Sequence, residues 1–384
     1  MALPSSGPLS IDDIRTELGS SSGSLRTLSA AAGKSTPDAI SEFYGYSSFT
    51  PSGNFNVITY SGNTATTRAI TGLSFKPDLV WIKNRDTYFG EWAVFDSVRG
   101  VTERLWLGAN GASGNSDYPQ DTDSNSLTSF NSNGFTVGSN DNDWNSNSYD
   151  FVAFCWKGAN SNSTNTTGSI SSTVSANPAA GFSIVKYTGN SSSSATVGHG
   201  LGSIPQWIII KRIEPQFEYE EWKMYSSSIG TSKAFEFNES SGPLSSAAYF
   251  PTAPTSSVFT PGTDAGVNQS TKQYVAYCFA NVTGYQKMGI YSGGSTGSGN
   301  QITTGFTPKF LIVKRNGSFD PWCVFDTVRD PSPTNTFLET DTNEGESTLF
   351  SSGEMVTTST GFYWNGTNDE TNDAGEQYVY LAIA

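Results

Sequence analysis

Carboxylate pairs are the side chains with which this chain could do hydrolytic chemistry. Two positioned Asp or Glu residues can cleave a glycosidic bond, one as the acid and the other as base or nucleophile. The candidates are Glu91 with Asp96, Glu220 with Glu221, and Asp369, Glu370 and Asp373. No pair recurs in all three copies of the sequence repeat described below, so a shared catalytic dyad is not expected. A site confined to one copy remains open.

Histidine and cysteine offer little nucleophilic or metal chemistry. The single histidine, His199, lies in a Gly-rich turn, and the other copies have Thr71 and Thr304 in that neighbourhood. A triad would also need a nucleophile and an orienting acid. Cys155 and Cys278 stand at matching places in apolar runs, which is typical of small core residues with free thiols. We therefore predict no enzyme activity, no zinc site and no cofactor.

Calcium is the other ion to consider. Asp121-Thr-Asp123-Ser-Asn125 has the alternating oxygens that begin an EF-hand loop, but Ser126 and Ser132 replace the Gly and the Glu that such a loop requires. A second oxygen-rich loop spans 140–143. Turn formation explains both loops, so no metal site is predicted, with a calcium ion in an acidic loop as the alternative.

The repeat is the dominant feature of the sequence. Each copy has an aliphatic-aromatic strand ending in Tyr, then Gly and Pro, an apolar run into Lys or Arg, and later a Trp. The prolines are Pro77, Pro205 and Pro308, and the tryptophans are Trp92, Trp222 and Trp322. The copies close with apolar strands at Phe151–Trp156, Tyr274–Phe279 and Tyr378–Ile383. Tandem copies favour presentation or bridging over catalysis, which needs one asymmetric site.

Some Trp residues are expected in a core and others at a binding surface, and two Asp–Arg pairs are expected to form salt bridges. We interpret the recurrent Trp residues as a core anchor for each domain. Trp144 and Trp364 lie in Asn-, Asp- and Gly-rich settings and are the candidates for surface binding, for example of sugars. Asp96 with Arg99, and Asp326 with Arg329, predict salt bridges that tie a loop.

Composition sets the class of protein. The chain has 384 residues and a formal net charge of −14. This charge gives no basic patch for nucleic acid, and no apolar stretch of about 18 residues is present to span a bilayer. The amino terminus lacks the pattern of a secretory signal, so we expect synthesis in the cytoplasm. Abundant Tyr, Phe, Trp, Val and Thr with turn-forming Gly, Ser and Asn predict a mainly β fold.

The first 47 residues differ from the rest because their signals are helical. Ser10 can cap a helix over Ile11–Leu18, and Thr36 precedes a second helix over Pro37–Tyr44. A third apolar patch lies around Leu25 and Leu28. Such a segment is too small to hold a large core, so it should dock onto the first β-domain or onto a partner. The residues expected to dock are Leu9, Ile11, Ile14, Leu18, Leu25, Leu28, Ile40, Phe43 and Tyr44.

These signals predict three tandem antiparallel β-sandwich domains, jelly-roll-like, preceded by a small α-helical segment. The expected divisions are a docking segment 1–47, repeat 1 over 48–158, a Ser/Thr/Asn-rich linker 159–180 with strand content near Ile170–Val174, repeat 2 over 181–283, and repeat 3 over 284–384.

Several blocks also resemble a known group of proteins. They are Met1–Ser10 running into Ile11–Arg15 and ending at Ile40–Gly45, together with Lys76–Arg85, Val94–Gly100, Ser126–Phe135 and Phe151–Trp156. These blocks resemble virion structural proteins of tailed bacteriophages, often labelled tail fibre. Copy 1 matches well, whereas copy 2 lacks the Phe-Asp-x-Val-Arg element.

The resemblance implies a location in the virion and a non-enzymatic role. We expect an appendage, a tail fibre or spike, that docks on tail or capsid proteins through its first segment and contacts a host glycan or receptor. It also implies a homo-oligomer, with a trimer favoured, although no heptad or collagen-like tract enforces one. The alternatives are a capsid decoration or cement protein or head fibre, and, third, a virion-associated polysaccharide-degrading enzyme.

Overall fold

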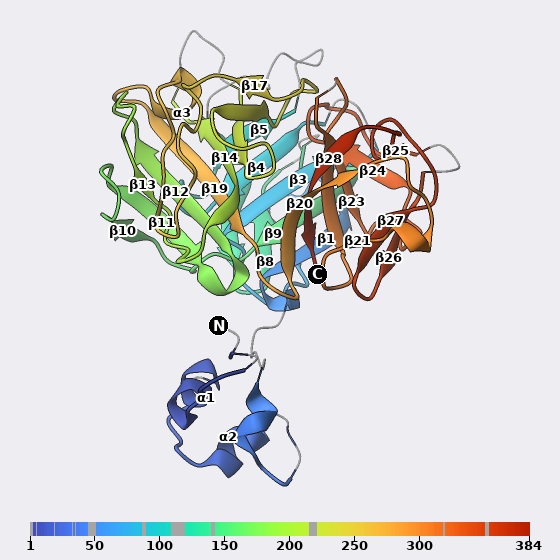
Figure 1. Ribbon diagram of the computed structural model, residues 1–384. Helices are drawn as coiled ribbons and strands as arrows, with labels where there is room; N and C mark the ends of the chain where they lie inside the picture. Colours follow the sequence, from blue (N-terminus) through green and yellow to red (C-terminus); the bar gives the residue numbers. More distant parts are fainter. Residues whose placement is uncertain are drawn as a thin grey trace. The chain divides into compact units, whose positions relative to one another are not determined.

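The chain forms two compact units, Met1–Gly53 and Asn54–Ala384. The computed structural model (Figure 1) describes residues 3–384 apart from 5, 19, 33, 35, 45–50, 87–89, 109–119, 140–142, 215–220, 318 and 350–352. Of the residues singled out above, Glu220 and 140–142 lie outside the described residues.

The first unit is helical. It contains α1 (Ile11–Leu18), α2 (Leu25–Ala31) and the short 3₁₀ turns η1 (Ile40–Phe43) and η2 (Pro51–Gly53). Ser10 caps α1 reciprocally, because its hydroxyl accepts the Asp13 N–H at 3.1 Å while the Asp13 carboxylate accepts the Ser10 N–H at 2.8 Å. The helix over Ile11–Leu18 is therefore present with the cap that the sequence predicts.

The helix expected over Pro37–Tyr44 is reduced to the single turn η1. Ala39 is extended, with φ −141° and ψ 146°, and its N–H donates to the Glu42 carboxylate at 2.6 Å. This cap stops the helical conformation from starting at Pro37, so only the last turn forms.

The second unit contains three large antiparallel sheets with one shared strand order. We name the corresponding segments repeat 1 (β1–β9), repeat 2 (β10–β19) and repeat 3 (β20–β28). In repeat 1 the order is β1 (Phe55–Ser61), β9 (Asp150–Trp156), β3 (Leu79–Asn84), β4 (Trp92–Asp96), β5 (Glu103–Leu107) and β6 (Asp121–Thr122). In repeat 3 it is β20 (Gln286–Ser292), β28 (Gln377–Ile383), β22 (Phe310–Arg315), β23 (Cys323–Asp326), β24 (Thr336–Glu339) and β25 (Ser347–Thr348).

Repeat 2 has the same order with two strands added at one edge. The sheet runs β10 (Ser163–Asn165), β11 (Ser172–Asn177), β12 (Phe182–Thr188), β19 (Gln273–Ala280), β14 (Pro205–Arg212), β15 (Lys223–Ser226), β16 (Lys233–Glu236) and β17 (Leu244–Ser245). The added strands β10 and β11 come from the segment 159–180 that was predicted as a linker, and β11 pairs with β12 along six residues. This segment is thus part of the second sheet.

A small sheet accompanies each large one. The small sheets are β2 (Arg68–Thr71), β8 (Gly134–Val137) and β7 (Leu127–Asn131); β13 (Val197–Gly198) and β18 (Val258–Phe259); and β21 (Ile302–Thr303), β27 (Gly361–Trp364) and β26 (Met355–Thr358). Short helical turns at η3 (Pro178–Ala180), α3 (Ala265–Asn268) and η4 (Ser298–Asn300) connect strands.

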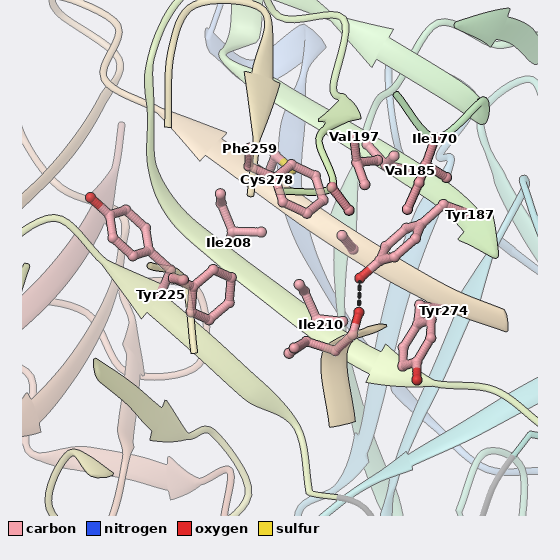
Figure 2. Packing of buried hydrophobic residues seen from close by; sticks show 14 of the residues in the cluster. Ile170, Val185, Tyr187, Val197, Ile208, Ile210, Tyr225, Phe259, Tyr274 and Cys278 are labelled. Carbon is pink, nitrogen blue, oxygen red and sulfur yellow. Dashed lines mark hydrogen bonds between the residues drawn. The ribbon is translucent and has the colours of Figure 1, made fainter. Parts of the chain in front are cut away.

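Each repeat has its own apolar core, which side chains from its large and small sheets fill. Figure 2 shows the core of repeat 2, in which Tyr187 donates its hydroxyl to the Val267 carbonyl at 2.6 Å and stacks on Tyr274 with ring centroids 5.2 Å apart. The same stack recurs in the other repeats as Tyr60 on Phe151 and Tyr291 on Tyr378. The Tyr that ends the first strand of each copy therefore ties a loop to the core.

The large sheets are also buried on the face that points away from this core. In β3, Val80 and Ile82 belong to the core of repeat 1, yet Trp81 and Lys83 on the opposite face are equally buried. Strands buried on both faces need a further layer of protein. The other two repeats supply that layer.

Candidate functional site

Three indole hydrogen bonds join the repeats in a cycle. Each recurrent Trp donates its Nε1–H to a backbone carbonyl of a different repeat. The pairs are Trp92 to Glu339 at 2.7 Å, Trp222 to Trp106 at 2.8 Å, and Trp322 to Glu236 at 3.2 Å. Repeat 1 thus donates to repeat 3, repeat 2 to repeat 1, and repeat 3 to repeat 2.

The three acceptors occupy one equivalent position. Within its own sheet, each acceptor pairs with the residue that follows the recurrent Trp of that repeat. The pairs are Ala93 with Trp106, Lys223 with Glu236, and Cys323 with Glu339. The cycle therefore has pseudo-threefold symmetry, and it closes after three steps.

Aromatic rings fill the space between the repeats. Phe310 of repeat 3 lies 5.0 Å from Phe55, 5.2 Å from Phe154 and 5.9 Å from Trp156, all of repeat 1, measured between ring centroids. Phe237 of repeat 2 lies 5.9 Å from Trp81 of repeat 1 and 4.8 Å from Trp322 of repeat 3. Such pairs add to the energy of apolar burial, so this shared interface is a second core.

A salt bridge reinforces the junction between repeats 1 and 3, which are not neighbours in sequence. Arg85 Nε lies 2.7 Å from Glu346 Oε1, and the Glu346 N–H donates to the Arg85 carbonyl at 2.8 Å. Arg329 also donates to Glu346, at 2.9 Å. Burial raises the pKa of Glu346, but the hydrogen bonds and charges of both arginines outweigh it and hold that pKa below its ordinary value.

A buried ion pair marks the junction between repeats 1 and 2. Arg99 and Asp96 both have fully buried side chains, with Arg99 Nε 2.5 Å from Asp96 Oδ2. Tyr277 of repeat 2 donates its hydroxyl to the same Oδ2 at 2.8 Å. The salt bridge predicted for Asp96 and Arg99 is confirmed, as is its counterpart between Asp326 and Arg329.

A buried lysine follows each apolar run and lies close to these junctions. Lys83 is fully buried and donates to the Gly90 carbonyl at 2.6 Å. Lys314 donates to the carbonyl of Ser240 in repeat 2 at 2.7 Å, and Lys211 lies 5.9 Å from the centroid of Trp222. Burial lowers the pKa of Lys83 to about 7, although carboxylates that include Glu339 of repeat 3 oppose this change.

Replacing Lys83 with methionine should remove a pH dependence from the stability of the protein. The folded pKa of about 7 lies below the ordinary 10.5, so the unfolded chain binds more protons between these values and wild-type stability rises with pH there. We expect Lys83→Met to stabilise by about 1–4 kcal/mol at pH 7, and this gain to fade toward pH 10.5. Urea denaturation across this range measures it, with the exposed Lys309→Met as control. A gain that does not change with pH would contradict the assignment.

The structure corrects the surface-binding prediction for Trp144 and Trp364. Trp144 is fully buried in the core of repeat 1, where its ring lies edge-on to that of Phe95. Trp364 is 1% exposed in the core of repeat 3, and its indole donates to the Tyr291 hydroxyl at 3.0 Å. Polar neighbours in sequence are typical of surface loops, so the residue composition around these indoles does not reveal their burial. Neither indole is available to a ligand.

The recurrent Trp residues are buried, as predicted, but they lie between repeats and not within the core of each repeat. One signal in the sequence pointed to this role. Leu79–Ile82 is a continuous apolar run without the polar alternation of a sheet that has one face in solvent, and such a run indicates burial on both faces.

Three of the candidate catalytic residues have hydrogen-bond or salt-bridge partners. His199 is buried, accepts the Leu201 N–H through Nδ1 at 3.2 Å and contacts the Thr255 carbonyl at 3.1 Å through Nε2, and burial lowers its pKa. Asp96 is held by Arg99, and Asp373 pairs with Arg315 at 3.2 Å.

Glu91, Asp369 and Glu370 make hydrogen bonds through their backbone, and Glu221 makes one through its carboxylate. Glu91 is buried and its N–H donates to Asp143 Oδ1 at 2.8 Å. The Asp369 carbonyl accepts the Tyr378 hydroxyl at 2.8 Å, and the Glu370 N–H donates to Asn368. The Asn238 side-chain amide donates a hydrogen bond to the Glu221 carboxylate.

The residues considered for calcium form a salt bridge and a turn. Asp121 pairs with Arg104, whose Nη2 lies 2.5 Å from Oδ2, and Asp123 Oδ1 accepts the Asn125 N–H at 2.8 Å. Among the described residues, no group of three or more His, Cys, Asp or Glu side chains could hold a metal ion.

The residues predicted for docking divide into two sets in the helical unit. Ile14, Leu28 and Phe43 are fully buried and, with Leu3, form a small core for that unit. Partly buried side chains pack around this core, including Leu9, Ile11, Leu18, Leu25 and Ile40. Tyr44 is 40% exposed and donates its hydroxyl to the Gly7 carbonyl. Only the second set and Tyr44 keep surface that a partner could contact.

These features define a mainly β protein in which three related repeats share one buried interface. Residues 50–384 match the family described as Domain of unknown function (DUF7483), so the chain belongs to that family. The match includes all three repeats and begins after the helices α1 and α2. Comparison with curated proteins and with solved structures found no match. Within the described residues, every helix is too short or too polar to cross a membrane.

Proposed function

We propose that this protein is a non-enzymatic structural component of a tailed-bacteriophage virion. Its first segment docks on tail or capsid subunits. The three repeats act as β-sandwich domains that attach to the host surface, as in a tail fibre or spike. The proposal rests on the sequence blocks that resemble phage virion proteins, and on one structural observation.

That observation is that the recurrent residues pack or form hydrogen bonds inside the protein. The Trp and the Tyr of the first strand recur in all three repeats and the Asp–Arg pair recurs in repeats 1 and 3, and packing or hydrogen bonds within the protein involve all of them. What recurs therefore builds a rigid support, while the polar loops are free to differ. Rigid supports with variable loops are typical of binding proteins.

The helical unit supports the docking part of the proposal. Its core leaves Leu9, Ile11, Leu18, Leu25 and Ile40 partly exposed, on a unit that is compact by itself. Partly exposed apolar side chains around a small core can gain further burial on a partner surface.

The cyclic contacts favour a second candidate, a capsid decoration or cement protein or a head fibre. Three domains in a row would extend far from the particle, whereas repeats that close on one another make a short, broad body. Such a body suits a site that lies across neighbouring coat subunits.

Particle incorporation tests the proposal. Particles assembled with the full chain should carry it, and particles assembled with residues 48–384 alone should lack it, while circular dichroism shows that the truncated protein retains its β structure. Imaging of the full-length protein on the particle separates a tail position from a shell position. Incorporation of the truncated protein at the normal level would contradict the docking role, and absence of the full chain from particles would contradict the virion proposal.

A further inference from the structure

We infer that the three repeats make this chain a single-chain counterpart of a homotrimer, so the protein is a monomer and one chain occupies the place of three. This inference goes beyond the proposed function and does not depend on it. Its basis is the indole cycle, in which every repeat donates once and accepts once. In a homotrimer, a head-to-tail interface of this kind closes between three subunits.

The first argument is that the interface has no open end. Repeats 1 and 3 are far apart in sequence, but they meet through the Trp92 hydrogen bond, the Phe310 ring contacts and the Arg85–Glu346 salt bridge. Every repeat therefore has both of its neighbours inside the same chain. Within the indole cycle, all three donor Trp residues and all three acceptor carbonyls are used inside one chain.

The second argument concerns the surface. Stable association of subunits requires a contiguous patch, of roughly 800 Å² per partner. The large apolar side chains that are exposed among the described residues of the β unit are Val101, Ile204, Ile290, Phe319 and Val328, and they lie on separate elements of the chain. Single exposed apolar side chains are normal on a protein surface and do not by themselves make a subunit interface.

The third argument is that the three junctions have different chemistry. Repeat 1 presents Asp96 and Arg99 to Tyr277 of repeat 2. Repeat 3 presents the equivalent Arg329 to Phe154 of repeat 1, 5.8 Å from the ring centroid, so an aromatic ring again meets the arginine.

At the third junction the equivalent residues are Ser226 and Ile229 of repeat 2 and Leu381 of repeat 3, all of them buried. The ion pair and the aromatic ring are thus replaced together, by a serine and two aliphatic residues. Identical subunits cannot vary their three junctions in this way. Each repeat is matched to one particular neighbour, and joining the repeats in a single chain ensures that these neighbours meet.

Mass in solution tests the inference first. Size-exclusion chromatography with light scattering on the full chain should give the mass of one chain, 41.1 kDa. A mass of two or three chains would overturn it, because the protein would then not be a monomer.

A cysteine pair tests whether the junction between repeats 1 and 3 closes within the same chain. Arg85 and Glu346 are joined by a backbone hydrogen bond, so Arg85→Cys with Glu346→Cys places two thiols on neighbouring backbones, while the three native cysteines are buried. Oxidation should give one-chain molecules that contain a closed loop and migrate differently without reductant. The single variants are the controls and should not change.

The outcomes of this second experiment are decisive in both directions. Covalent multimers would show that repeats are exchanged between chains, and absence of any disulfide in the folded double variant would show that the junction is open. If the double variant does not fold, the mass of the wild-type protein still decides the question.

Discussion

Replacing Trp222 with alanine should destabilise the whole β unit by about 3–5 kcal/mol, the range found when a fully buried tryptophan is truncated. Trp222 has no exposed surface, donates to the Trp106 carbonyl at 2.8 Å, and stacks on Tyr277 with ring centroids 6.2 Å apart. Its removal leaves a cavity at the junction between repeats 1 and 2. Urea denaturation followed by tryptophan fluorescence measures the loss.

The contribution of the hydrogen bond can be separated from that of burial. Trp222→Phe keeps a buried ring but loses the donor to the carbonyl, so we expect a further cost of about 1–3 kcal/mol relative to a matched substitution without such a bond. Trp207 of the same repeat provides that match, because it is buried and its indole nitrogen has no hydrogen-bond partner among the described residues. Equal losses for Trp207→Phe and Trp222→Phe would contradict a role for the indole cycle.

Replacing Arg99 with alanine should cost about 3–5 kcal/mol, because the Asp96 carboxylate would stay buried without its counter-charge. Both side chains are fully buried, and Arg99 also donates to the Glu103 and Val94 carbonyls at 3.0 Å. Urea denaturation at pH 7 measures the loss. The partly exposed pair Arg104–Asp121 gives the control, since Asp121→Asn should cost about 1 kcal/mol or less.

The junction between repeats 2 and 3 suggests how to restore the stability that Arg99→Ala removes. The triple variant Asp96→Ser, Arg99→Ile and Tyr277→Leu installs the residues that repeats 2 and 3 use at the equivalent positions. Because a buried ion pair can be replaced by a packed apolar set at little cost, we expect the triple variant to be clearly more stable than Arg99→Ala. A triple variant that is as unstable as the single one would show that the junctions are not interchangeable.

The sequence predicts the strands well because their signals are local. Apolar runs bounded by Gly and Pro, such as Leu79–Ile82 after Pro77, are strands in the structure, and so are the closing strands at Phe151–Trp156 and Tyr378–Ile383. The Asp96–Arg99 salt bridge is equally local, because its partners are three residues apart in a turn.

The arrangement of the repeats could not be predicted in the same way. Trp92 and Glu339 are 247 residues apart in sequence, and no local pattern marks the Glu339 carbonyl as the acceptor. Trp144 shows the opposite error, since its polar neighbours indicate a surface although the indole is buried. For the segment 159–180, strand content was expected near Ile170–Val174, and β11 forms there, but Ser, Thr and Asn are typical of loops and did not indicate that it would pair with β12 in the second sheet.

Calorimetry tests the central claim most directly, namely that the three repeats form one closed body. If the repeats share one core, thermal unfolding of the β unit should be a single transition in which the calorimetric and van't Hoff enthalpies agree. Trp222→Ala should then move the entire transition to lower temperature. Separate transitions for the repeats, with only one of them shifted by Trp222→Ala, would contradict the account.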